Sequence, residues 1–212
     1  MGNKITGEMI VEIMKKNLEF PFIGSAPGVE FSHGSDEYLN ITINCRRSKN
    51  INDIVDLILN NVDGDILEIG ALTGTSTRVL CESAKRKNRI VHVIDPWDGR
   101  EAGDDGMYQM FLARTSSYNN LKVLKVSSTS SEAAEYIKNL KLSFCLVDGL
   151  HTYDYAMSDL KVAEESISDS GVICLDDINI PEVKRAAVDF CSSSNWRLLE
   201  IDSHIESFLL RE

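Results

Sequence analysis

The sequence predicts an α/β fold in which helices cover both faces of a mainly parallel sheet. Three observations support this prediction. Strand-like and helix-like segments alternate from residue 50 onward. Strands such as Phe144–Val147 are apolar throughout, which is typical of strands buried on both faces. A short turn joins the last two strands, 196–201 and 207–210, so they are expected to pair antiparallel, because a parallel crossover needs about a dozen residues or more.

The first 49 residues are predicted to form a region of their own. Apolar residues recur at helical spacing over Ile5–Leu18, which indicates an amphipathic helix. Residues 20–48 contain several prolines and glycines and show no sustained period beyond a candidate strand at 38–43. We interpret residues 1–49 as an N-terminal helix followed by a cap or lid.

The remaining elements follow one another regularly. A helix with apolar residues from Ile51 to Leu59 leads into the first strand of the sheet. The predicted strands are 66–69, 90–94, 121–126, 144–147, 172–175, 196–201 and 207–210. Helical segments separate the first six of these strands, and this alternation favours a parallel sheet with helical crossovers.

Composition and charge exclude several functions. Among 212 residues, 22 Lys and Arg stand against 33 Asp and Glu, which gives a net charge of −11. A nucleic-acid-binding protein needs clustered positive charge, so we expect no nucleic-acid partner. No apolar run reaches the roughly 18 residues that span a bilayer, and charged residues interrupt the first twenty positions, so neither a membrane helix nor a signal peptide is expected. The sequence leaves open whether the chain forms a homo-oligomer.

The five cysteines are scattered, and Cys145 and Cys174 lie in apolar runs where another small hydrophobic side chain would serve equally well. This pattern predicts reduced core thiols and a cytoplasmic protein. Gly2 and Thr6 fit the short pattern for N-myristoylation, but a segment that only leads into the first helix is the simpler interpretation.

Ligands of open α/β sheets bind at the carboxyl ends of the strands, so the residues that follow each strand are the candidates for function. Gly70 and Gly74 lie between the first strand and a helix, where glycine lets the backbone approach a ligand closely. Asp95 follows the second strand, where an acid can accept hydrogen bonds from both hydroxyls of a ribose. Leu72 occupies the position of the middle glycine in G-x-G-x-x-G, which disfavours a nicotinamide dinucleotide.

Acidic residues also follow the fourth and fifth strands: Asp148, and then Asp176 and Asp177. If these carboxylates converge, the repulsion between them favours a bound divalent cation, and Mg²⁺ prefers oxygen ligands of this kind. Such an ion could hold a substrate hydroxyl and make it more acidic. Neighbouring residues of a strand face opposite ways, so we favour Asp148 and Asp177 over Asp176. The alternative is that Asp176 or Asp177 caps the following turn.

Four ordered motifs resemble those of class I S-adenosylmethionine-dependent methyltransferases, and most closely the metal-dependent O-methyltransferases that act on sugars and antibiotic precursors. The motifs are Leu67–Ser76, Ile94–Gly99, Leu146–Tyr153 and Gly171–Asp177. In this family a large apolar residue at the position of Leu72 is typical. The resemblance implies a Rossmann-like three-layer sandwich whose sheet has seven strands, the last antiparallel. It also implies a methyltransferase domain over residues 50–212 and methyl transfer to a hydroxyl of a small molecule.

The resemblance further implies roles for individual residues. The turn Gly70–Ser76 would hold the methionine part of the cofactor, Asp95 would bind its ribose, and Pro96 and Trp97 would flank the adenine. The alternative is that Trp97 is a core aromatic. The implied cofactor-binding residues are Glu68, Gly70, Ala71, Thr73, Gly74, Thr75, Ser76, Asp95, Pro96, Trp97, Ser128, Thr129 and Asp148. Relatives usually carry an acid that contacts the adenine amine in the turn that here reads Ser127–Ser130, and hydroxyls could accept the same hydrogen bond.

His151 stands three residues after Asp148, where the catechol-type relatives hold a lysine base. An imidazole can take a proton near neutral pH, so we predict that His151 is the general base and that Asp148 is the second catalytic residue. The alternative is that His151 only hydrogen-bonds its own loop. Many sugar-methylating relatives have an acid at the position of Leu150, and this departure leaves the number of metal ions open.

Two other functions stay open. One is a nucleotide- or nicotinamide-using enzyme on a related sheet, which the glycine spacing disfavours. The other is a methyltransferase-like module that binds without catalysis, which Asp148, His151 and Asp177 disfavour. The methyl acceptor cannot be read from the sequence, because its pocket would come from residues 20–48, the loop 98–106 and the segment after Asp177.

Overall fold

The computed structural model describes residues 4–18, 36–99, 105–201 and 206–211. Gly2, most of the segment interpreted as a lid and the middle of the loop 98–106 lie outside these ranges. No helix within the described ranges combines the length and the apolar character that crossing a membrane requires.

Seven strands form one sheet, in the order β3-β2-β1-β4-β5-β7-β6. Their bounds are β1 Asp65–Ile69, β2 Val91–Ile94, β3 Leu121–Leu124, β4 Leu142–Val147, β5 Ile167–Leu175, β6 Trp196–Leu199 and β7 Ser207–Arg211. Strands β1 to β5 are parallel, and β7 runs antiparallel to both β5 and β6. The predicted strand positions, the parallel core and the antiparallel final pair are confirmed. β5 begins five residues before the predicted start at residue 172.

The carboxyl ends of the five parallel strands are level with one another. Ile69 at the end of β1 pairs with Ile94 of β2 and with Val147 of β4. Ile94 pairs in turn with Leu124 of β3, and Val147 pairs with Leu175 of β5. Because the register is continuous across all five strands, the residues that follow them meet at one edge of the sheet.

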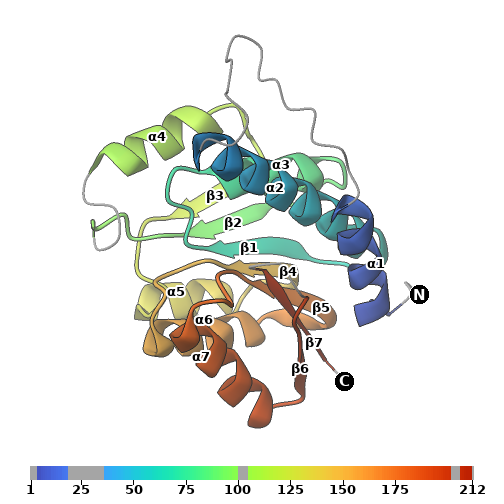
Figure 1. Cartoon of the computed structure of the whole chain (residues 1–212). Helices are drawn as coiled ribbons and strands as arrows, with labels where there is room; N and C mark the ends of the chain where they lie inside the picture. The colour runs from blue at the N-terminus through green and yellow to red at the C-terminus, as the bar shows by residue number, and fades with distance from the viewer. Residues whose placement is uncertain (1–3, 19–35, 100–104, 202–205, 212) are drawn as a thin grey trace.

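The helices lie in two layers. Their bounds are α1 Gly7–Leu18, α2 Asp36–Asn61, α3 Thr75–Lys85, α4 Asp105–Thr115, α5 Ser131–Ile137, α6 Tyr153–Glu164 and α7 Pro181–Ser192. Figure 1 shows α1, α2 and α3 over one face of the sheet and α5, α6 and α7 over the other. This arrangement is the predicted three-layer sandwich.

Each face of the sheet has its own apolar core, because consecutive strand residues point to opposite faces. Ile66 of β1 packs with Ile54 and Ile58 of α2 in the first core. The next residue, Leu67, lies in the second core with Leu160 of α6. All five of these side chains are fully buried. The strands are therefore covered on both sides, as their apolar sequences predict.

The candidate strand at 38–43 is wrong, because α2 runs without interruption from Asp36 to Asn61. No glycine or proline interrupts this stretch. The apolar residues Ile51, Ile54, Val55 and Ile58 bury one face of the helix against the sheet. Once the C-terminal half of the helix is fixed, extending it towards the N-terminus costs little free energy per turn. The strand propensity of the β-branched residues in the N-terminal half is too weak to outweigh this extension. The proposed boundary between residues 49 and 50 therefore falls inside a helix.

We predict that Gly70→Ala destabilises the fold by about 2–4 kcal/mol. Gly70 has φ +83°, and a Cβ atom there would lie 1.9 Å from the carbonyl oxygen of Asp148, which is backbone and cannot move aside. Gly74→Ala is the matched control, because its φ of +81° is nearly the same but its nearest neighbours are side-chain atoms at 3.0 Å and beyond. Gly74→Ala should lower the free energy of unfolding by about 1–2 kcal/mol. Urea unfolding measures the stability of both variants. Equal losses of stability would show that the close approach of Gly70 to the Asp148 carbonyl is not what makes Gly70→Ala costly.

Candidate active site

A cavity of about 380 Å³ opens at the carboxyl ends of the parallel strands. Gly70, Asp95, Ser128, Asp148 and Asp177, which follow β1 to β5, all line it. The level strand ends explain this, since each loop begins at the same edge of the sheet. The sequence motifs of four separate segments thus meet at a single site.

Most of the predicted cofactor-binding residues line this cavity. They are Gly70, Ala71, Thr73, Thr75, Ser76, Asp95, Pro96, Trp97, Ser128 and Asp148. Glu68, Gly74 and Thr129 do not belong to the lining. Glu68 is fully buried and accepts a hydrogen bond from the hydroxyl of Thr77 at 2.5 Å, which ties β1 to α3. Gly74 is the residue that caps the N-terminus of α3.

The Asp95 carboxylate organises two of the loops. One oxygen accepts hydrogen bonds from the backbone N–H groups of Ala71 and Leu72, at 2.8 and 3.0 Å. The other oxygen accepts from the N–H of Trp97 at 2.7 Å. A carboxylate offers about four lone-pair positions, so three backbone donors leave capacity for a ligand hydroxyl. Asp95 therefore holds the glycine turn in place and still faces the cavity.

Trp97 is both a core aromatic and part of the cavity wall, so the two interpretations of this residue are compatible. Only 7% of Trp97 is exposed, and its ring lies 4.7 Å from the rings of both Tyr108 and Phe111 of α4. Its indole N–H donates to the carbonyl of Leu72 at 2.7 Å. The tryptophan thus links α4 to the glycine turn, while it lines the cavity beside Asp95.

Backbone strain collects around the cavity. Within the described part of the chain, four non-glycine residues have positive φ, and three of them line the cavity: Leu72 at 46°, Trp97 at 44° and Asp177 at 53°. Residues that carry a Cβ atom disfavour a positive φ. Such a conformation persists where surrounding contacts impose it. The hydrogen bonds from Leu72 and Trp97 to Asp95 are such contacts.

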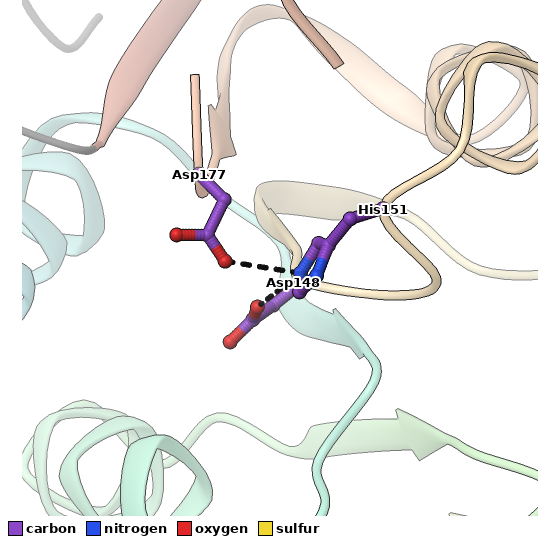
Figure 2. Close-up of side chains that lie close together, drawn as sticks. All are labelled: Asp148, His151 and Asp177. Carbon is purple, nitrogen blue, oxygen red and sulfur yellow. Dashed lines mark ion pairs between the residues drawn. The ribbon is translucent and has the colours of Figure 1, made fainter. Parts of the chain in front are cut away.

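Asp148, His151 and Asp177 form a compact group at the far side of the cavity from the β3 loop. His151 Nε2 lies 3.0 Å from an oxygen of Asp177 and 3.7 Å from an oxygen of Asp148, and Figure 2 shows the imidazole facing both carboxylates. One ligand atom from each residue lies within 4.8 Å of the others. Two carboxylates and an imidazole are a donor set that a divalent metal ion accepts.

Asp176 is not a member of this group. Its side chain is buried, with 2% of the residue exposed, and its backbone N–H continues the ladder by donating to the carbonyl of Val147 at 3.0 Å. The chain leaves the strand at Asp177, whose left-handed backbone directs its carboxylate towards His151 (Figure 2). The structure thus joins two of the three predicted metal ligands with the predicted base.

Several lining residues were not predicted from the sequence. Ile51 of α2, Met107 of α4, and Tyr155 and Asp159 of α6 all line the cavity. Ser48, which also lines it, belongs to the segment 20–48 that was expected to contribute to the acceptor pocket. Asp159 is 1% exposed, and burial raises the pKa of its carboxyl to about 7, against the opposing effect of a hydrogen bond with Ser128.

The helical spacing contains a signal for Asp159. The buried residues of α6 are Ala156, Asp159, Leu160 and Ala163, which recur at intervals of three, one and three. An acid at this position of an amphipathic helix faces the protein interior. Asp159 lies within a helix and not after a strand, so the strand-end motifs do not include it.

The sequence matches a protein family described as a methyltransferase domain over residues 67–178, just over half of the chain. All four strand-end motifs fall within this range. No curated protein matches the chain significantly.

Solved structures share the fold at low sequence identity. CalS11, a TDP-rhamnose 3'-O-methyltransferase of calicheamicin biosynthesis, is 12% identical with a TM-score of 0.60, and the match covers 96% of this chain and 93% of CalS11. The SAH-bound methyltransferase PaMTH1 of Podospora anserina is 11% identical with a TM-score of 0.61, over 100% of this chain and 90% of that one. Aeropyrum pernix fibrillarin, with natively bound S-adenosyl-L-methionine, is 11% identical with a TM-score of 0.51, over 74% and 72%.

At these identities the solved structures show the fold, and the family match shows the relationship. The four motifs, the sheet order and the cavity at the level strand ends agree with both. The chain belongs to the methyltransferase-domain family, and the resemblance to class I S-adenosylmethionine-dependent methyltransferases is confirmed.

Proposed function

We propose that the protein transfers the methyl group of S-adenosylmethionine to a hydroxyl of a small molecule, with the assistance of Mg²⁺. The observation that carries the proposal is that one cavity contains the glycine turn, Asp95 and the group of Asp148, His151 and Asp177. Methyl transfer to a hydroxyl needs a cofactor site and a proton acceptor, and a bound metal ion would make the hydroxyl more acidic.

The strand order suggests how the cofactor lies. The glycine turn follows β1, Asp95 follows the neighbouring β2, and Ser127 and Ser128 follow β3 on the outer side. S-adenosylmethionine consists of an amino acid, a ribose and an adenine in that order. Adjacent strands are about 4.8 Å apart, so a cofactor with its methionine at the β1 turn and its ribose at Asp95 extends its adenine towards the β3 loop.

His151 is the proposed general base. The carboxylates of Asp148 and Asp177 lie on its cavity side and orient the imidazole, and their negative charge favours the protonated ring that forms when a hydroxyl loses its proton. Asp148 also borders the glycine turn, because a Cβ at Gly70 would touch its carbonyl oxygen. The base is thereby held beside the methionine end of the cofactor.

The metal proposal rests on the same group. The oxygens of Asp148 and Asp177 would hold Mg²⁺, which prefers carboxylate ligands and keeps several positions for water or substrate. When bound, the ion would lower the pKa of the acceptor hydroxyl. The residues fit the ion because two half-buried carboxylates and an imidazole bring their ligand atoms within 4.8 Å of one another.

The acceptor and the cellular setting are also part of this proposal. Ser48 and Ile51 of α2 and Met107 of α4 add a mixed polar and apolar wall, which suits a small organic acceptor. The four cysteines that the structure describes are free thiols, as expected for a protein of the reducing cytoplasm. A binding module without catalysis remains the alternative function, and turnover of S-adenosylmethionine distinguishes the two.

S-Adenosylmethionine and S-adenosylhomocysteine should both raise the melting temperature of the protein, because a ligand that binds only the native state stabilises it. Asp95→Ala should abolish most of this shift, since it removes the ribose partner and the anchor of the glycine turn. Asp63→Ala, at the opposite end of β1, is the control that should keep the full shift. Undiminished affinity of Asp95→Ala in titration calorimetry would show that the ribose does not bind there.

Activity should require Mg²⁺ or a similar hard cation, and Asp177→Asn should weaken both the activity and its dependence on the metal. The neutral amide is a poorer ligand and leaves Asp148 as the one carboxylate next to His151. Turnover of S-adenosylmethionine is measured against metal concentration with an acceptor drawn from a panel of sugars and phenols. Asp154→Asn, an exposed acid on α6, serves as the control. Full activity in excess chelator would remove the metal from the mechanism.

His151→Ala should lower turnover by about 10²- to 10⁴-fold, the usual contribution of a positioned proton acceptor. Cofactor affinity should change little, because the residue faces the two carboxylates rather than the turn that holds the methionine. The rate is measured with saturating cofactor, and affinity is measured separately by calorimetry. A variant with unchanged turnover would mean that another group takes the proton and that His151 only holds its loop.

A further inference from the structure

Among the described residues, acidic side chains line the cavity and lysine and arginine do not. The acids come from the loops after β2, β4 and β5 and from α6, and they are Asp95, Asp98, Asp148, Asp159, Asp176 and Asp177. The proposed ribose partner and the two proposed metal ligands account for three of these six acids. The cavity therefore holds more negative charge than those two roles require.

The charge of the whole chain has the same sign as the charge of the cavity. The net charge of the sequence is −11. Residues 19–47, 100–105 and 202–205, whose side chains lie outside the described set, contain eight acidic residues against three arginines. A cleft that is lined by one sign of charge concentrates ligands of the opposite sign and repels ligands of its own sign.

Asp159 is independent evidence that a ligand with hydrogen-bond donors suits this cavity. The residue is 1% exposed and lines the cavity wall. Its Oδ1 atom is inaccessible to solvent and has no hydrogen-bond partner among the residues that the structure describes. Burying an acceptor without a donor costs free energy, so a ligand that brings N–H groups is favoured over one that brings only acceptors.

The excess of negative charge persists when the proposed cofactor and metal ion are bound. S-Adenosylmethionine carries a sulfonium, an ammonium and a carboxylate, so its net charge is one positive, and Mg²⁺ adds two. These charges neutralise half of the six carboxylates of the wall. Burial raises the pKa of the Asp159 carboxyl to about 7, so this group is partly protonated at neutral pH. Between two and three negative charges therefore remain for the acceptor to meet.

We propose that the cavity selects its acceptor by charge, and that the acceptor is a hydroxyl compound that carries a protonated amine. This inference rests on the proposed function and narrows its acceptor class. An ammonium group brings a positive charge and three N–H donors to a wall of carboxylates. A compound with a phosphate or carboxylate brings a charge of the same sign and only acceptor atoms, so the cavity rejects it.

The first test measures the charge of the cavity with two cofactor forms. The sulfur of S-adenosylmethionine is a cation, and the sulfur of S-adenosylhomocysteine is neutral. In titration calorimetry the affinity for S-adenosylmethionine relative to S-adenosylhomocysteine should fall by about two- to fivefold in Asp98→Asn, because this exposed acid of the wall loses its charge. Raising the salt concentration should lower the same ratio, because salt screens the carboxylates. Asp154→Asn, an exposed acid outside the wall, is the matched control and should keep the wild-type ratio.

The second test measures the acceptor preference with three phenols that share one hydroxyl and differ in the charge of a side chain. Tyramine carries an ammonium group, 4-ethylphenol is neutral, and 4-hydroxyphenylacetate carries a carboxylate. Their affinities for the protein with saturating S-adenosylhomocysteine and Mg²⁺ should fall in that order, by about tenfold or more from first to last at low salt. Asp98→Asn should narrow this difference, and Asp154→Asn should not.

The outcomes separate this inference from the proposed function. The charge selection would be overturned if the ratio of the two cofactor affinities stayed the same in Asp98→Asn and at high salt. It would also be overturned if tyramine showed no advantage over 4-hydroxyphenylacetate, and in both cases binding of the cofactor would leave the methyltransferase function standing. If the protein bound neither S-adenosylmethionine nor S-adenosylhomocysteine, the proposed function itself would fail. A thermal melt without ligand shows that the variants are folded.

Discussion

The Asp95 carboxylate is the contact on which the geometry of the cavity depends. It binds backbone N–H groups from the loop after β1 and from its own loop after β2, so two loops from neighbouring strands share one anion. Hydrogen bonds to a charged acceptor are stronger than those between neutral groups, which helps to hold Leu72 and Trp97 in left-handed conformations. The indole N–H of Trp97 closes a second link between the same loops. The turn is therefore shaped before any ligand binds, and little binding free energy is needed to order it.

The level strand ends determine which acids can act together. The register brings Asp148 after β4 next to the end of β5, but it gives no advantage to Asp177 over Asp176. The distinction comes from the point at which the strand ladder stops. Asp176 also lines the cavity, but it still makes a ladder hydrogen bond and is only 2% exposed, whereas Asp177 lies one residue beyond and reaches His151.

The sequence predicts those features of this protein that depend on short-range periodicity. Apolar strands and the loops that follow them are visible in the sequence, and this is why Asp95, Asp148 and Asp177 were found. The course of α2 was not visible, because its N-terminal half lacks the clear helical period of Ile51–Ile58. Asp159 was missed because it lies within a helix and not at a strand end, and its contact with Ser128 joins segments about 30 residues apart. No local pattern encodes such a contact, although the buried spacing along α6 marks the acid as an exception.

Glu68 and Asp159 show how a structural acid differs from a candidate ligand-binding one. Both are almost completely buried. Glu68 lies between β1 and α3, accepts the hydroxyl of Thr77 and does not line the cavity, so tying the strand to the helix explains its burial. Asp159 lines the cavity, and its hydrogen bond with Ser128 is too weak to offset the effect of burial on the pKa of its carboxyl. Desolvation of this acid is therefore only partly balanced by its hydrogen bond with Ser128, which explains why the pKa of its carboxyl is raised while it lines the cavity.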